Sequence, residues 1–161
     1  MDGKRMTGWA IGALLLAAVP AGAQAPAARP DQAARHFAVA HAGLESAEIH
    51  AEMLEAITKR PELYDEAHGR HFVDRIDQAL GHVRTHVGHL EPLVESEEER
   101  RQLKALTDRL DEAERAANGL AAGVSDPGRL HRTADDVERR IERAEEPLER
   151  LAEQMKVPID L

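Results

Sequence analysis

Apolar residues recur at alternating spacings of three and four along most of this chain, and this regularity leaves few folds open. Four stretches keep the pattern without a slip, at residues 37–54, 73–90, 103–120 and 130–155. Such a spacing places apolar side chains on one face of an α-helix and suits helices that pack side by side in left-handed bundles. The sequence therefore predicts an all-α fold.

The boundaries between these stretches carry residues that begin or end helices. Pro61 and Pro92 interrupt the helical pattern, and Ser96 followed by Glu99 has the spacing of a capping box. Pro127 suits the first turn of a helix, where its missing N–H costs nothing. The connections are short, so consecutive helices are expected to run antiparallel.

We predict an antiparallel up-down-up-down four-helix bundle over residues 31–157. The alternative is an extended helical hairpin or coiled coil whose core is completed by a partner chain. Many small Ala residues at core positions of the first and third helices keep that alternative open.

Composition agrees with the helical prediction and excludes several classes of protein. Aromatic residues are only 2% of the chain, which disfavours a β-sandwich or barrel. The absence of Cys excludes disulfides, iron–sulfur clusters and thiolate zinc sites. The formal charge is −9 and no dense basic patch is present, so nucleic acid is not an expected partner.

Residues 1–23 have the three parts of a secretory signal. Lys4 and Arg5 are positive, eleven mostly apolar residues follow, and a small-residue cleavage site ends at Ala23. The apolar stretch is well below the roughly 20 residues that span a bilayer. We predict cleavage, a periplasmic or secreted protein, and no membrane span in the mature chain. Residues 24–30, rich in Ala and Pro, predict an extended tether.

Histidine is the one chemical signal in the sequence, with nine residues. At 100° per residue, the histidines of the second helix share an arc of about 60° that flanks the apolar row. They are His68, His71, His82, His86 and His89.

An antiparallel hairpin brings further ligands to this stripe. With the turn near Pro61, His36 is expected beside His86 and His89, and His50 beside His71. Two candidate metal sites follow. The first comprises His36, His82, His86 and His89, and the second comprises His50, Met53, His68 and His71.

Imidazole is a ligand for copper, nickel and zinc, and a thioether at Met53 favours Cu(I). Because the neutral ring is the ligand, binding should weaken below about pH 6. We predict an exported bundle that binds one of these metals for buffering or sensing. The alternative is a non-catalytic structural or protein-interaction bundle of the cell envelope, with incidental surface histidines and a homodimer or envelope protein as its partner.

No catalytic pattern is present in the sequence. Di-iron bundles need Glu-x-x-His on two helices, and no histidine here has Glu three residues before it. His-Glu-x-x-His, phosphate-binding loops and dinucleotide fingerprints are also missing. Few aromatic residues are available to pack a porphyrin. Neither an enzyme nor a haem protein is expected.

Overall fold

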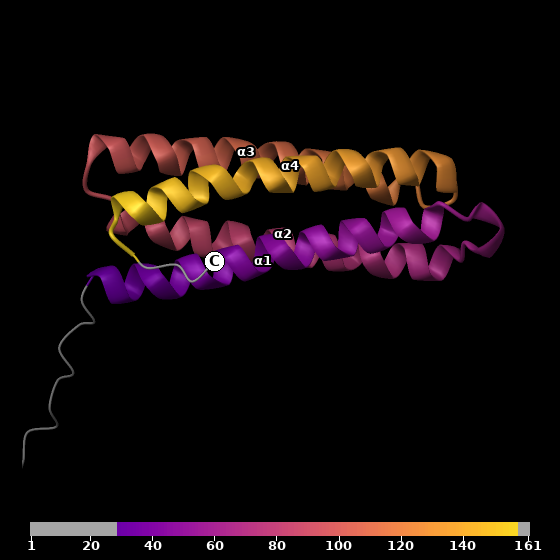
Figure 1. Ribbon diagram of the computed structural model, residues 1–161, viewed down its shortest axis with the longest axis horizontal. Coiled ribbons are helices and arrows are strands. Elements are labelled where there is room, and N and C mark those ends of the chain that lie inside the picture. The colour runs from indigo at the N-terminus through magenta and orange to yellow at the C-terminus, as the bar shows by residue number, and fades with distance from the viewer. Residues whose placement is uncertain (1–28, 158–161) are drawn as a thin grey trace, which may run out of the picture.

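The structure is a computed structural model that describes residues 29–157, and these residues form four long helices joined by short loops (Figure 1). The helices are α1 (Arg29–Thr58), α2 (Glu66–Leu90), α3 (Glu97–Ala121) and α4 (Pro127–Gln154), with 3-10 turns η1 (Pro61–Leu63) and η2 (Glu91–Leu93). Two antiparallel hairpins, α1–α2 and α3–α4, lie one on the other, with α4 over α1 (Figure 1). The predicted antiparallel four-helix bundle is confirmed.

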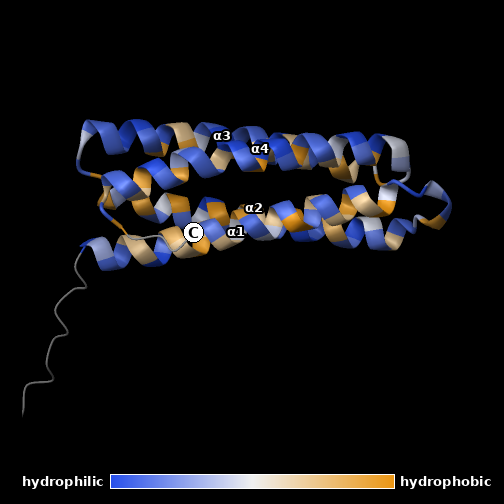
Figure 2. Ribbon diagram, viewed as in Figure 1, coloured by the Kyte–Doolittle hydropathy of each residue, from blue (hydrophilic) through white to orange (hydrophobic). Residues whose placement is uncertain are grey.

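The apolar rows of the sequence form the core. Fully buried side chains come from every helix, including Phe37, Ile76, Leu110 and Ile141. The outward surfaces of α3 and α4 are hydrophilic in Figure 2, as expected of amphipathic helices. The core closes within one chain, so the alternative in which a partner completes it is not what the structure shows.

The helix ends follow the sequence signals closely. The Ser96 hydroxyl accepts from the N–H of Glu99, and the Glu99 carboxylate accepts from the N–H of Ser96, which confirms the capping box. Asp126 is the N-cap of α4, with Pro127 in the first turn. Within residues 29–157, no helix combines the length and apolarity that crossing a bilayer requires.

The N-terminal end of α1 differs from the prediction. The helix begins at Arg29, so the last two residues of the predicted tether are helical. Pro30 is compatible with this because a helix tolerates proline in its first turn. The predicted signal sequence and the remainder of the tether lie outside the described residues.

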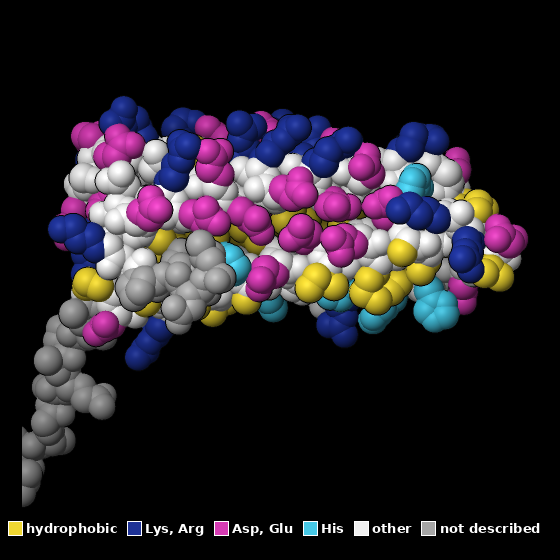
Figure 3. All heavy atoms as spheres, viewed as in Figure 1, with side chains coloured by type: hydrophobic (Ala, Val, Ile, Leu, Met, Phe, Trp, Pro, Cys, Tyr) yellow, Lys and Arg dark blue, Asp and Glu magenta, His cyan; other side chains and the backbone are white. Residues whose placement is uncertain are grey.

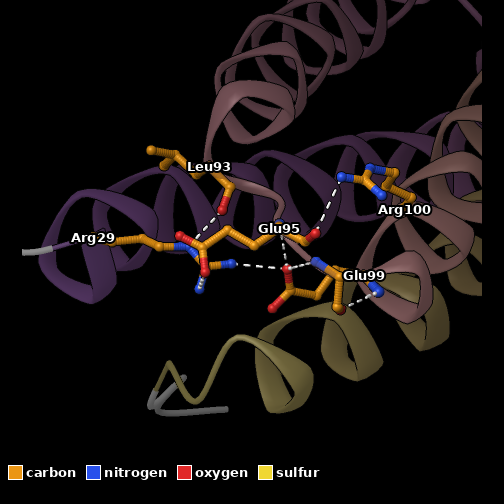
Figure 4. A network of polar contacts seen from close by, with 6 residues as sticks. Arg29, Leu93, Glu95, Glu99 and Arg100 are labelled. Carbon is orange, nitrogen blue, oxygen red and sulfur yellow. Dashed lines mark hydrogen bonds and ion pairs between the residues drawn. The ribbon is translucent and has the colours of Figure 1, made fainter.

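Arg29 also ties this end of α1 to the loop before α3 (Figure 4). Its Nε donates to the carbonyl of Leu93 at 2.5 Å, and its guanidinium pairs with Glu99 at 2.8 Å. Glu99 is buried, and its carboxylate also accepts from the N–H of Glu95. Burial opposes its ionisation, but these hydrogen bonds and Arg29 outweigh it and lower the pKa of Glu99. The network fixes the position of α1 against the second hairpin.

Candidate metal centre

Three histidines converge across the α1–α2 interface. One ring nitrogen from each of His36, His86 and His89 lies within 4.8 Å of the other two. His36 and His86 are partly buried, and His89 is exposed. The Nδ1 atoms of His36 and His86 are 3.1 Å apart. The prediction that His36 lies beside His86 and His89 is confirmed.

The helices approach closely enough for this contact because α1 carries glycine where it crosses α2. A Cβ added at Gly43 would lie 2.6 Å from Cγ2 of the buried Val83. Gly43 follows His36 by seven residues, and Val83 precedes His86 by three. These are helical spacings that keep each pair on neighbouring parts of one helix face. We expect the close contact at Gly43 to help keep the imidazoles of the two helices within reach of one another.

The spacing of the ring nitrogens is suited to a shared metal ion. Two nitrogens bound tetrahedrally at the usual Zn–N distance lie about 3.3 Å apart. The 3.1 Å between His36 and His86 is close to that value. The exposed His89 ring completes the group, with its centroid 4.9 Å from that of His36 and 5.7 Å from that of His86. Three imidazoles leave a fourth tetrahedral position that water can occupy.

The surroundings keep His36 in the form that binds metal. Burial lowers its pKa below 6.5, and the neighbouring His89 and His86 lower it further when they are charged. A neutral imidazole has a free lone pair for a metal ion. His36 therefore stays neutral, and free to bind a metal ion, to a lower pH than an isolated histidine would.

The fourth residue of the first predicted site, His82, lies elsewhere. It lines a shallow groove of about 350 Å³ together with His50 and His71. His82 and His86 share a helix face, but one turn separates them by about 6 Å along the axis. That spacing would allow chelation, but in the structure the His82 side chain lines the groove with His50 and His71 and is not part of the trio.

The residues of the second predicted site do not converge as three residues of the first site do. His50 and His71 do lie on neighbouring parts of the surface, since each ring lies near Phe72, with centroids at 6.1 Å and 5.8 Å. However, Nδ1 of His50 is engaged with the carbonyl of Ser46. Among residues 29–157, the three-residue group of potential His, Cys, Asp or Glu ligands is the trio at the other end of the hairpin.

The remaining members of the second site have separate surroundings. The His68 side chain is 74% exposed, and its Nδ1 lies 3.2 Å from the Asp65 carboxylate. Met53 is 45% exposed on the outer side of α1. A thioether ligand at Met53 stays a prediction from the sequence.

An acidic ridge where α4 lies over α1 was not predicted from the sequence. Acidic side chains run along the middle of the face in Figure 3, and burial together with their mutual repulsion raises the pKa values of Glu48, Glu138 and Glu145. The available signal is the regular three-and-four spacing of glutamates on α1, at Glu45, Glu48, Glu52 and Glu55. The same spacing is typical of an ordinary solvated helix surface.

Comparisons with family models, with curated proteins and with solved structures found no match to this chain. The fold and the site together define the class as a four-helix bundle with an interhelical cluster of three histidines that could bind a metal ion.

Proposed function

We propose that this protein is an exported helical bundle that binds a first-row transition metal ion, with buffering or sensing of that metal as its role. The observation that supports metal binding is the convergence of His36, His86 and His89, with 3.1 Å between the Nδ1 atoms of the first two. Copper, nickel and zinc are the proposed metals because imidazole nitrogen suits all three.

The three metals are expected to bind with different affinities. A site made only of neutral imidazoles follows the general affinity order for divalent ions, in which Cu²⁺ exceeds both Ni²⁺ and Zn²⁺. Protons compete for the same lone pairs, so affinity should fall as the pH falls below about 6. The lowered pKa of His36 reduces this competition at one of the three ligands.

Calorimetric titration of the metal-free protein at pH 7.5 tests the proposal. We expect one ion per chain, with Cu²⁺ bound most tightly. His86→Ala removes a ligand that contacts both other rings and should weaken binding by about 100-fold. His68→Ala is the matched control, since it removes an exposed histidine of the same helix that pairs with Asp65. It should leave stoichiometry and affinity unchanged.

Two outcomes of this titration would overturn the proposal. One is the absence of uptake of any of the three metals at pH 7.5. The other is equal binding by the wild type and His86→Ala, which would mean that any bound metal sits elsewhere.

One observation favours the alternative of a protein-interaction bundle. The side of α1 that faces away from the core carries Val39, Ile49 and Met53, which are 41%, 52% and 45% exposed. At 100° per residue they fall within about 80° of one another. If the titration shows no metal binding, this apolar stripe becomes the main indication of function, and it points to a protein partner.

A further inference from the structure

A groove with a volume of about 730 Å³ lies between α2 and α3, where the chain turns through η2. Apolar side chains from both helices and from the connecting loop contribute to it, namely Val87, Pro92, Val94 and Leu103. Its size falls within the range of small-molecule sites, which are mostly apolar with a few polar groups at the edge.

The groove exists because α2 and α3 pack together less extensively than the other neighbouring helix pairs. Gly88 contributes no side chain to the space between them, and a Cβ added there would meet nothing within 4 Å. The groove therefore results from the loose packing of α2 and α3 and from the absence of a side chain at Gly88. A larger residue at position 88 would fill it.

Cationic side chains border this apolar surface in a chain whose formal charge is −9. Arg84, Arg100 and Lys104 line the groove, and Glu91 is the acidic residue among its lining. Arg84 is held by Glu114, with Nη2 to Oε2 at 2.7 Å, and it also pairs with Asp111. Its charge is balanced by these two carboxylates, so it does not attract a ligand anion.

The other two cations are free to change partners. Arg100 and Lys104 lie one turn apart on α3, and their pairs with Glu97 and Asp108 are highly exposed. Exposed pairs of this kind contribute little to stability, so a ligand anion can replace the present partner at small cost. Glu91 opposes an anion on the α2 side, which favours a carboxylate near Arg100 and Lys104.

We propose that this groove binds a single-chain aliphatic carboxylate, with the alkyl chain over Val87 and Leu103 and the carboxylate between Arg100 and Lys104. An apolar floor with a cationic edge matches the two parts of such a ligand in both chemistry and charge.

The proposed groove is independent of the histidine cluster. Arg84, Val87, Gly88 and Glu91 lie on the side of α2 opposite to His86 and His89, as 100° per residue requires. Loss of the metal ligands should leave carboxylate binding unchanged. The two proposals can therefore fail separately.

Calorimetric titration with octanoate, decanoate and laurate, each below its micellar concentration at pH 7.5, tests the proposal. Each methylene buried on the floor should tighten binding by about fourfold, so affinity should rise steeply from octanoate to laurate. The neutral 1-dodecanol should bind at least tenfold more weakly than laurate, because it cannot pair with Arg100 and Lys104.

Two glycines of α2 offer a matched pair of variants. Gly88→Leu should fill the floor and weaken laurate binding at least tenfold. Gly81→Leu is the control: Gly81 lies one heptad earlier on the same helix, is also exposed, and has nothing within 4 Å of an added Cβ. Both variants replace a helical glycine and should fold well. Only the first should affect binding.

The charge is tested with Arg100→Gln combined with Lys104→Gln, which should weaken laurate binding and leave that of 1-dodecanol unchanged. Three results would overturn the proposal. They are no laurate binding, laurate binding that is equal in Gly88→Leu and Gly81→Leu, and equal or tighter binding of 1-dodecanol. Unchanged laurate binding in His86→Ala supports its independence from the metal site.

Discussion

Glu138 is a single side chain whose surroundings disfavour its charged form and so lower the stability of the folded state. One carboxylate oxygen is buried and has no hydrogen-bond partner. Burial raises its pKa first, followed by repulsion from Glu55, Glu52, Glu142 and Glu48. The negative charge of Glu138 also acts on Lys59 and helps to raise the pKa of that lysine. The charged form of Glu138 therefore opposes folding near neutral pH.

The raised pKa of Glu138 determines how its contribution to folding stability changes with pH. Between pH 4.5 and the raised pKa, the folded state holds more protons on Glu138 than the unfolded state, so stability falls as the pH rises through that window. His36 acts in the opposite sense. Its lowered pKa favours folding above pH 6.5, and this contribution is lost as the pH falls towards the folded-state value.

Glu138→Gln removes the charge while keeping the shape of the side chain. We expect the free energy of unfolding at pH 7 to increase by about 0.5 kcal/mol, the scale of like-charge repulsion between helix neighbours. The gain should shrink towards pH 4, where the wild-type carboxyl is protonated. Urea denaturation at pH 7 and pH 4 measures both values.

Glu146→Gln is the matched control for that experiment. Glu146 lies on the same helix but pairs with Arg150, so its neutralisation removes a favourable contact. It should not stabilise the protein at pH 7. Equal stabilisation by both substitutions would contradict the role assigned to the ridge, because it would reflect net charge alone.

At the scale of the helices, the contact between α1 and α2 links packing to the metal site. Gly43→Ala places a methyl group 2.6 Å from Cγ2 of Val83, and Val83 is fully buried and branched at Cβ. We expect α1 and α2 to separate locally, with a loss of about 1–3 kcal/mol in stability. If the same contact keeps His36 near His86, metal affinity should fall as well.

Gly81→Ala provides the comparison for Gly43→Ala. It adds the same methyl group to a helical glycine with open space around it. It should stabilise the protein by about 1 kcal/mol and leave metal affinity unchanged. Thermal unfolding and calorimetric titration of both variants give the two readouts. Unaltered metal affinity in a destabilised Gly43→Ala protein would show that the close contact does not position the site.

The helices themselves were predictable because each depends on local signals. Ser96 and Glu99 are close in sequence, so the capping box is recognisable from the spacing of the two residues alone. The meeting of His36 with His86 followed from the short turn at Pro61, which limits the register of the hairpin. Gly43 could not be assigned its role, since a close approach depends on which residue of the other helix lies opposite.

The whole molecule shows why only part of the histidine stripe became a site. Periodicity reports the face of a helix, whereas a metal ion also requires ligands at one level along the axis. His68 and His86 share a face but are about 27 Å apart along α2. The structure accordingly gathers three of the predicted ligands and leaves the others along the bundle.

The proposed metal centre is tested most sharply by a long-range ¹H–¹⁵N NMR spectrum of the imidazole nitrogens, recorded without zinc and with one equivalent of zinc. We predict that ring nitrogens of His36, His86 and His89 shift to the metal-bound range, while those of His50, His68 and His71 keep their positions. Metal-bound shifts at any of the latter three, with the trio unchanged, would refute the assignment of the site.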